Sequence, residues 1–101
     1  VELLLAAIAG CSSVDVDAGT SRRSTPEGFE GLASALKQTE DGAVRLDDVE
    51  VDFDVRFPED EQGAKAQKMV DRLIQLSEQK DCTVSRTVAH PTNVSFHNLA
   101  D

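Results

Sequence analysis

The sequence contains no tryptophan, no tyrosine and only four phenylalanines among its 101 residues. Its hydrophobic core must therefore consist mainly of Val, Leu, Ile and Ala side chains. A chain of this length buries only about 60 to 70% of the surface that it exposes when unfolded, so the core is small. We expect a single domain over residues 1–101, stabilised further by self-association.

Basic residues are also few. Ten Lys and Arg residues stand against nineteen Asp and Glu residues, which gives a formal net charge of -9. Proteins that bind nucleic acids neutralise phosphates with clustered Lys and Arg side chains. The composition therefore excludes nucleic acid as a partner.

No apolar run reaches the roughly 20 residues that a membrane-spanning helix needs. We therefore expect a soluble, cytoplasmic protein with no membrane partner. An alternative rests on the tetrapeptide IAGC at residues 8–11, which is typical of the cleavage site of a bacterial lipoprotein and would leave Cys11 lipidated. Neither Met nor a basic residue precedes it, however, and Glu2 occupies the place of the basic segment that such signals carry.

The most apolar stretch is VELLLAAIAGCSSVDV at residues 1–16. Four apolar or small residues of this stretch and the residues after it recur at helical spacing, and they are Leu4, Ile8, Cys11 and Ala18. No polar face interrupts residues 3–10, and this pattern predicts a helix that is buried on all sides. Cys11 then lies at the polar boundary of the buried part, directly before two serines.

Within residues 46–57, LDDVEVDFDVRF, apolar and polar side chains alternate strictly from Val49 to Phe57. This alternation predicts a strand with one packed face and one solvated face. The acidic residues of the second face are interpreted as solvated rather than as a calcium site, because carboxylates along one strand do not wrap around a cation.

A second helix is expected after Pro58, with Asp60 as its N-cap. Its apolar side chains fall on one side at helical spacing, and they are Ala66, Met69, Val70, Leu73, Ile74 and Leu76. We expect a kink near Lys80, with Asp81 capping a short segment that carries Cys82. A last strand is predicted over Pro91–His97.

The two cysteines, Cys11 and Cys82, lack the C-x-x-C spacing. His90 and His97 are not spaced from them as zinc ligands would be, so we expect no metal site and no cofactor. We interpret the histidines as a loop residue and a surface residue. Spacing alone favours a structural interpretation of the cysteines, either a disulfide that closes a long loop or two buried thiols.

Two segments of the chain resemble motifs of the OsmC/Ohr family, the osmotically inducible and organic-hydroperoxide-resistance proteins. The sequence VELLLAAIAGC at residues 1–11 is similar to the run that ends in the family's first cysteine. The sequence LSEQKDCTVS at residues 76–85 is similar to the helix that carries the second. Weaker similarity covers residues 26–30 and 49–57, so the resemblance extends over nearly the whole chain.

The resemblance implies an α+β fold in which the motif helix and a second, cysteine-bearing helix pack on an antiparallel sheet, in an intertwined homodimer. It also implies that residues 29–39, where periodicity alone favours a helix, form the first strand of a hairpin. Family members commonly carry a strand-rich stretch before the motif helix. Because this chain begins at the motif, we expect a shortened member.

The resemblance further implies a thiol-dependent peroxidase. Cys11 would attack an organic hydroperoxide, Cys82 would resolve the resulting sulfenic acid as a disulfide, and a dithiol reductant would restore both thiols. The alternative is a non-catalytic or truncated OsmC-like protein.

Activation of Cys11 requires a nearby cation, because an apolar setting raises the pKa of a thiol. In the family, an arginine from the preceding stretch has this role, and it has no counterpart here. Glu2 lies one position after the place of the glutamate that holds this arginine, and we include it among the candidate catalytic residues. Arg22 and Arg23 would lie roughly 16 Å along the helix from Cys11, which is too far to serve it.

Overall fold

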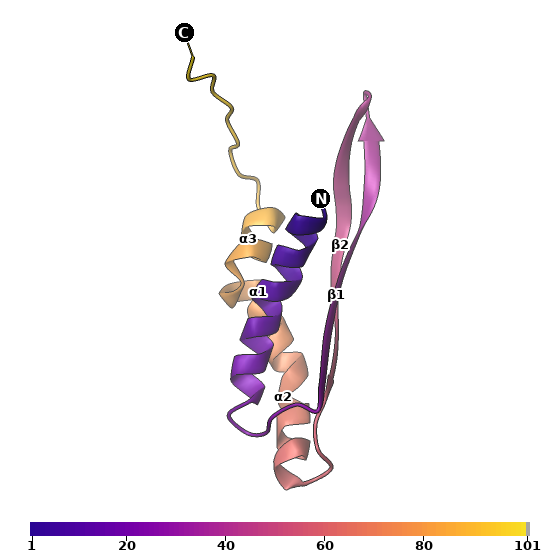
Figure 1. Ribbon diagram of the computed structural model, residues 1–101, viewed down its shortest axis with the longest axis vertical. Helices are drawn as coiled ribbons and strands as arrows, with labels where there is room; N and C mark the ends of the chain where they lie inside the picture. The colour runs from indigo at the N-terminus through magenta and orange to yellow at the C-terminus, as the bar shows by residue number, and fades with distance from the viewer. Residues whose placement is uncertain (101) are drawn as a thin grey trace.

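The computed structural model describes residues 1–100. In chain order its elements are α1 (Glu2–Thr20), β1 (Gly28–Glu40), β2 (Ala43–Arg56), α2 (Glu61–Leu76), the π-helical turn η1 (Ser77–Asp81) and α3 (Thr83–Ala89). Figure 1 shows the helices side by side along a long β-hairpin. The α+β fold class expected from the sequence is confirmed.

The hairpin consists of β1 and β2, which pair as an antiparallel two-stranded sheet. Pairing extends from Gly28, opposite Arg56, to the turn at Asp41 and Gly42. Both turn residues have positive φ, a conformation that Gly and Asp adopt more readily than other residues. The strand that the family resemblance implies over residues 29–39 is confirmed, and the helix favoured there by periodicity is wrong.

The strand predicted over residues 46–57 is also confirmed, and its two faces differ as the alternation predicts. Val55 is buried on the face that packs toward the helices. On the other face Glu50, Asp52 and Asp54 are exposed. Water therefore solvates these carboxylates.

A small core joins α1, the hairpin and α2. Its buried members are Val16, Val55, Phe57, Ala66 and Val70, and Phe29, Phe53, Leu73 and Ile74 pack against them. Helix α2 begins as predicted, because the Asp60 carboxylate accepts a 2.7 Å hydrogen bond from the Gly63 N–H. Gly19 lets α1 approach α2 closely, since a methyl group at this position would lie 2.6 Å from both terminal carbons of Leu73.

Burial of α1 differs from the sequence-based prediction. Its buried residues are Ile8, Ser12, Val16 and Thr20, which form one stripe at a spacing of four. Leu3, by contrast, is 87% exposed. The expectation of burial on all sides is therefore wrong for this chain, because the elements packed against α1 cover only one side of it.

By length and composition, α1 also qualifies as a helix that could cross a membrane. The prediction that no apolar run reaches the length of a membrane span is therefore wrong by this criterion. Core helices of water-soluble proteins and N-terminal signal sequences meet the same criterion, so this property does not by itself make α1 a membrane span.

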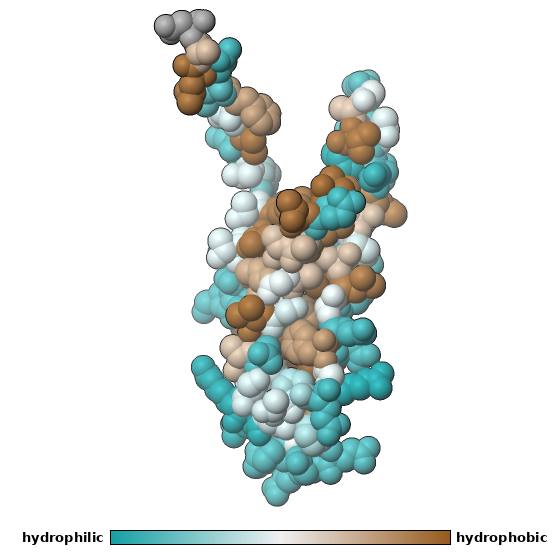
Figure 2. All heavy atoms as spheres, viewed as in Figure 1, coloured by the Kyte–Doolittle hydropathy of each residue, from teal (hydrophilic) through white to brown (hydrophobic). Residues whose placement is uncertain are grey.

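The chain after α3 forms no strand. Residues 91–100 have no regular secondary structure, so the strand predicted over Pro91–His97 is wrong. A strand needs a neighbouring backbone with which to pair, and this segment leads away from the helices on its own (Figure 1). Figure 2 shows that it and the hairpin tip diverge at one end of the molecule, which measures 63 × 27 × 21 Å.

Candidate functional site

Cys82 lies at a break between two helical segments. The π-helical turn η1 follows α2 directly, and the Cys82 N–H donates a 2.8 Å hydrogen bond to the Ser77 carbonyl. The backbone of Cys82 is then extended, and its sulfur accepts a hydrogen bond from the Ser85 N–H at 3.4 Å. The kink predicted near Lys80 is confirmed, but Cys82 itself, rather than Asp81, caps the segment that follows.

The fold brings Cys82 next to Cys11 of α1. Their two sulfur atoms and a carboxylate oxygen of Asp15 all lie within 4.8 Å of one another. Both thiols are free; Cys82 is fully buried, whereas Cys11 is only half-buried. The two cysteines named from the sequence thus form one site, and Cys11 is the member that solvent reaches.

Two serines donate hydrogen bonds to groups of this site. The buried Ser12 hydroxyl donates a 3.5 Å hydrogen bond to the Cys82 sulfur. The Ser77 hydroxyl donates a 2.7 Å hydrogen bond to the Asp15 carboxylate and so connects η1 to α1. These hydrogen bonds orient the Cys82 side chain and the Asp15 carboxylate.

Sequence reasoning missed Ser12, Asp15, Ser77 and Ser85. Asp15 follows Cys11 by four positions, so helical spacing places the two side chains on one face. Ser12 lies on the stripe that packs inward, between Ile8 and Val16. Helical geometry could therefore have identified these two. Ser77 and Ser85 both lie in the second motif, LSEQKDCTVS at residues 76–85, but only the fold shows that Ser77 contacts Asp15.

The hydrogen bonds act on the two thiols in opposite directions. Burial raises the pKa of the Cys82 thiol, but the hydrogen bonds that its sulfur accepts outweigh burial and lower this pKa to about 7; the donors are Cys11, Ser12 and Ser85. Donating to Cys82 raises the pKa of the Cys11 thiol, and the Asp15 carboxylate raises it further. The more acidic thiol is therefore Cys82, whereas the family resemblance implies an attacking thiolate at Cys11.

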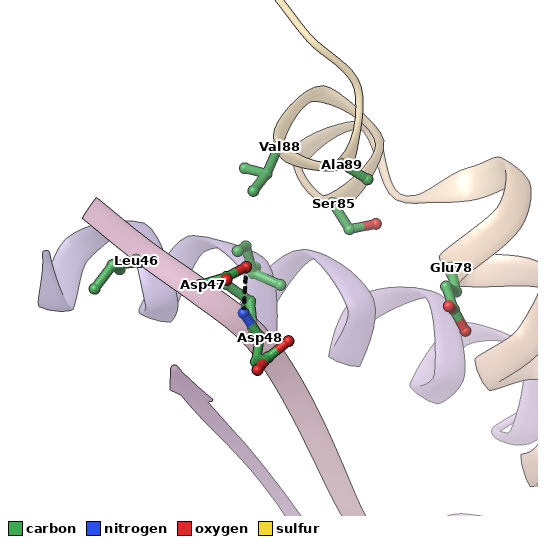
Figure 3. Close-up of a pocket in the computed structure, with 9 residues that line it drawn as sticks. Leu46, Asp47, Asp48, Glu78, Ser85, Val88 and Ala89 are labelled. Atoms are coloured by element: carbon green, nitrogen blue, oxygen red, sulfur yellow. Dashed lines mark hydrogen bonds between the residues drawn. The ribbon is translucent and has the colours of Figure 1, made fainter. Parts of the chain in front are cut away.

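Two clefts separate β2 from the helices beside the cysteine pair. The first has a volume of about 400 Å³, and Leu46, Asp47 and Asp48 lie across it from Ser85 and Val88 of α3 (Figure 3). The second has a volume of about 360 Å³. Ser12 and Ser85 line it, and the Ser12 hydroxyl and the Ser85 backbone N–H both donate to the Cys82 sulfur.

The other residues considered from the sequence lie away from the cysteines. Glu2 is exposed at the start of α1, where it pairs with the amino group of Val1 at 3.6 Å. Nine helical residues place it about 13 Å along the axis from Cys11. His90 and His97 are exposed at the end of α3 and in the C-terminal segment. Among the described residues, no cation contributes to the pKa shift of Cys11.

Comparison with known proteins agrees with the two motifs. A family model described as OsmC-like protein matches residues 1–97. Comparison with curated proteins and with solved structures gives no match. Because the family match covers nearly the whole chain, the chain belongs to the OsmC-like protein family.

Proposed function

We propose that the protein is a thiol-dependent peroxidase that reduces organic hydroperoxides with Cys11 and Cys82. The proximity of the two sulfurs within 4.8 Å carries this proposal, because a cysteine oxidised at one position must meet a second thiol to form a disulfide. Family membership supports a redox role for the pair.

The difference in exposure assigns a role to each sulfur. A hydroperoxide from solvent can reach the half-buried Cys11 but not the fully buried Cys82. Cys11 is therefore the peroxidatic residue and Cys82 the resolving residue. Glu2, exposed and far along α1, takes no step in this proposal.

Within the described chain, the Cys82 thiolate acts as the base that takes the proton of the Cys11 thiol. As the Cys11 sulfur attacks the terminal peroxide oxygen, its proton passes to the Cys82 thiolate, whose sulfur lies within 4.8 Å of it. The O–O bond breaks, and the leaving alkoxide takes a proton from water to become the alcohol. Cys11 is now a sulfenic acid and Cys82 a neutral thiol.

Disulfide formation completes the oxidative half of the cycle. The Cys82 sulfur attacks the sulfur of the Cys11 sulfenic acid, an S–S bond forms, and the oxygen leaves as water with the Cys82 proton. A dithiol reductant then reduces the disulfide by thiol–disulfide exchange and is itself oxidised. Because reduced thiols are needed, this cycle suits a cytoplasmic location.

Neither cysteine lines the first cleft, but Ile8 and Ser85 line it close to them, and we propose that the organic group of the substrate binds there. Ile8, Leu46 and Val88 give it apolar surface for an organic group. Asp47, Asp48 and Glu78 also line it, and their carboxylates would repel a negatively charged substrate. We therefore propose uncharged organic hydroperoxides rather than ionised fatty-acid hydroperoxides as the preferred substrates.

We further propose that the protein acts as a homodimer. The sheet has only two strands, so the outer edge of each strand lacks a hydrogen-bonding partner within the described chain. Leu32, Leu36 and Val44 are exposed on the hairpin. Figure 2 shows apolar residues at the hairpin tip, away from the helices. A second subunit would cover these surfaces.

The direct test is turnover of cumene hydroperoxide with dithiothreitol as reductant. Cys11→Ser should abolish turnover, and Cys82→Ser should leave a sulfenic acid at Cys11 that a dimedone-type probe traps. Ser13→Ala is the matched control on the same helix and should turn over normally. Unchanged turnover in both cysteine variants would refute the proposal, and lack of turnover by the unmodified chain would favour a non-catalytic member of the family.

A further inference from the structure

The cysteine pair has a third potential ligand beside it. Cys11 and Asp15 extend from the same face of α1, one turn apart, and Cys82 approaches them from the end of η1. Their two sulfurs and one carboxylate oxygen form a triangle with no side longer than 4.8 Å. We infer that these three side chains form a site for a thiophilic divalent cation when both cysteines are reduced.

The donor set suits a zinc-like ion. Zinc, a borderline ion, binds both soft thiolate ligands and harder carboxylate ligands in proteins. Zinc–sulfur bonds of about 2.3 Å at tetrahedral angles place two sulfurs about 3.8 Å apart. The present triangle is therefore within about 1 Å of the required geometry, and a water molecule would complete the coordination as the fourth ligand.

The surroundings orient the ligands and leave a route to the site. Hydrogen bonds from Ser12 and Ser85 hold the Cys82 sulfur, and one from Ser77 holds the Asp15 carboxylate. Such outer contacts fix the direction of metal ligands. Cys11 and Asp15 are only partly buried, so their side chains can adjust and an ion can approach from their side.

Cys82 is far from Cys11 and Asp15 in the sequence, and for this reason the sequence predicts no metal site. The cysteines have no metal-binding spacing, and neither histidine is spaced from them as a zinc ligand would be. Only the packing of η1 and α3 against α1 brings the three ligands together. Metal binding also requires both thiols to be reduced, so a bound ion and a Cys11–Cys82 disulfide exclude each other.

Binding can be tested by titrating Zn²⁺ into the reduced, full chain in competition with a chromophoric chelator. We expect one equivalent to bind with release of thiol protons to the buffer. Asp15→Asn should weaken binding by about tenfold or more, because the amide is a poorer ligand than the carboxylate. Asp17→Asn is the matched control, since Asp17 is exposed on the same helix and its carboxylate accepts a hydrogen bond from the Ser21 hydroxyl; the zinc affinity of this variant should be unchanged.

A second readout does not depend on affinity. Co²⁺ bound to the reduced chain should show thiolate-to-metal charge-transfer absorption, and this band should weaken in either cysteine variant and vanish once the disulfide has formed. Equal zinc affinity in the oxidised chain or in Cys11→Ser would overturn the inference. No peroxide is involved, so metal binding and peroxidase turnover succeed or fail independently.

Discussion

The hydroxyl of Ser12 donates a 3.5 Å hydrogen bond to the sulfur of Cys82, seventy positions further along the chain. Ser12 lies on the stripe of α1 that packs inward, where an apolar residue would otherwise be expected. Its position stabilises a negative charge on a fully buried sulfur. The contact therefore links the packing of α1 to the chemistry of the cysteine pair.

Removal of this donor should make Cys82 less acidic. Ser12→Ala deletes a hydrogen bond to a charged sulfur, so the pKa of Cys82 should rise from about 7, by roughly one unit. The pH dependence of thiolate absorbance in the reduced protein measures this shift. Ser13→Ala serves as control, and an equal shift in both variants would show that the Ser12 hydroxyl has no specific role.

Stability of the reduced protein should increase from about pH 7 to about pH 9. The pKa of Cys82 falls from its ordinary value of 9.0 to about 7 on folding. The stabilisation is thus complete above pH 9, the pKa of Cys82 in the unfolded chain. It is lost as the pH falls through about 7, the pKa of Cys82 in the folded protein. The gain amounts to about 2 kcal/mol.

Above about pH 9 the trend should reverse, because the folded protein raises the pKa of Cys11 and resists its ionisation. Urea unfolding at a series of pH values, with a non-thiol reductant present, measures both effects. Cys82→Ser should lack the increase between neutral and alkaline pH. A variant that kept the full increase would assign it to other groups.

Two glycines of α1 should respond oppositely to alanine. A methyl group at Gly10 meets no atom within 4 Å, so Gly10→Ala should raise the free energy of unfolding by about 0.5 to 1 kcal/mol through helix propensity. At Gly19 the methyl would lie 2.6 Å from both terminal carbons of Leu73, which would have to rotate out of the core. Gly19→Ala should therefore be less stable than Gly10→Ala by about 1 to 3 kcal/mol, as measured by thermal unfolding.

The N-cap of α2 should contribute measurably to stability. Asp60→Ala removes the acceptor for the Gly63 N–H and should lower the free energy of unfolding by about 1 kcal/mol. Glu59→Ala changes an exposed neighbouring carboxylate outside the cap and should alter stability much less. Equal losses in the two variants would indicate a charge effect instead of a capping bond.

The sequence pattern correctly predicted the second strand of the hairpin and the start of α2. Strict alternation over residues 49–57 predicted a strand, and Asp60 predicted a helix start. Residues 29–39 were ambiguous, because Leu32 and Leu36 fit either period and cross-strand pairing decides between them. Burial around α1 and the absence of a strand after α3 depend on which surfaces the rest of the protein covers, and no local pattern records this.

The two cysteines of the site were predictable from the sequence, but the electrostatics of the site was not. Two motifs identified Cys11 and Cys82, and helical spacing could have added Asp15. The hydrogen bond from Ser77 joins residues 62 positions apart, so only the fold could reveal it. The lower pKa of Cys82 likewise depends on donors that tertiary packing assembles.

The proposed cycle depends on a disulfide that forms between Cys11 and Cys82 of the same chain after Cys11 has been oxidised. Peptide mapping by mass spectrometry after treatment with one equivalent of cumene hydroperoxide tests it most directly. We predict that the intact chain loses two hydrogen atoms and that the peptides containing Cys11 and Cys82 are recovered as one disulfide-linked species within a single chain. Recovery of Cys11 as sulfinic or sulfonic acid, with Cys82 still a free thiol, would contradict the claim.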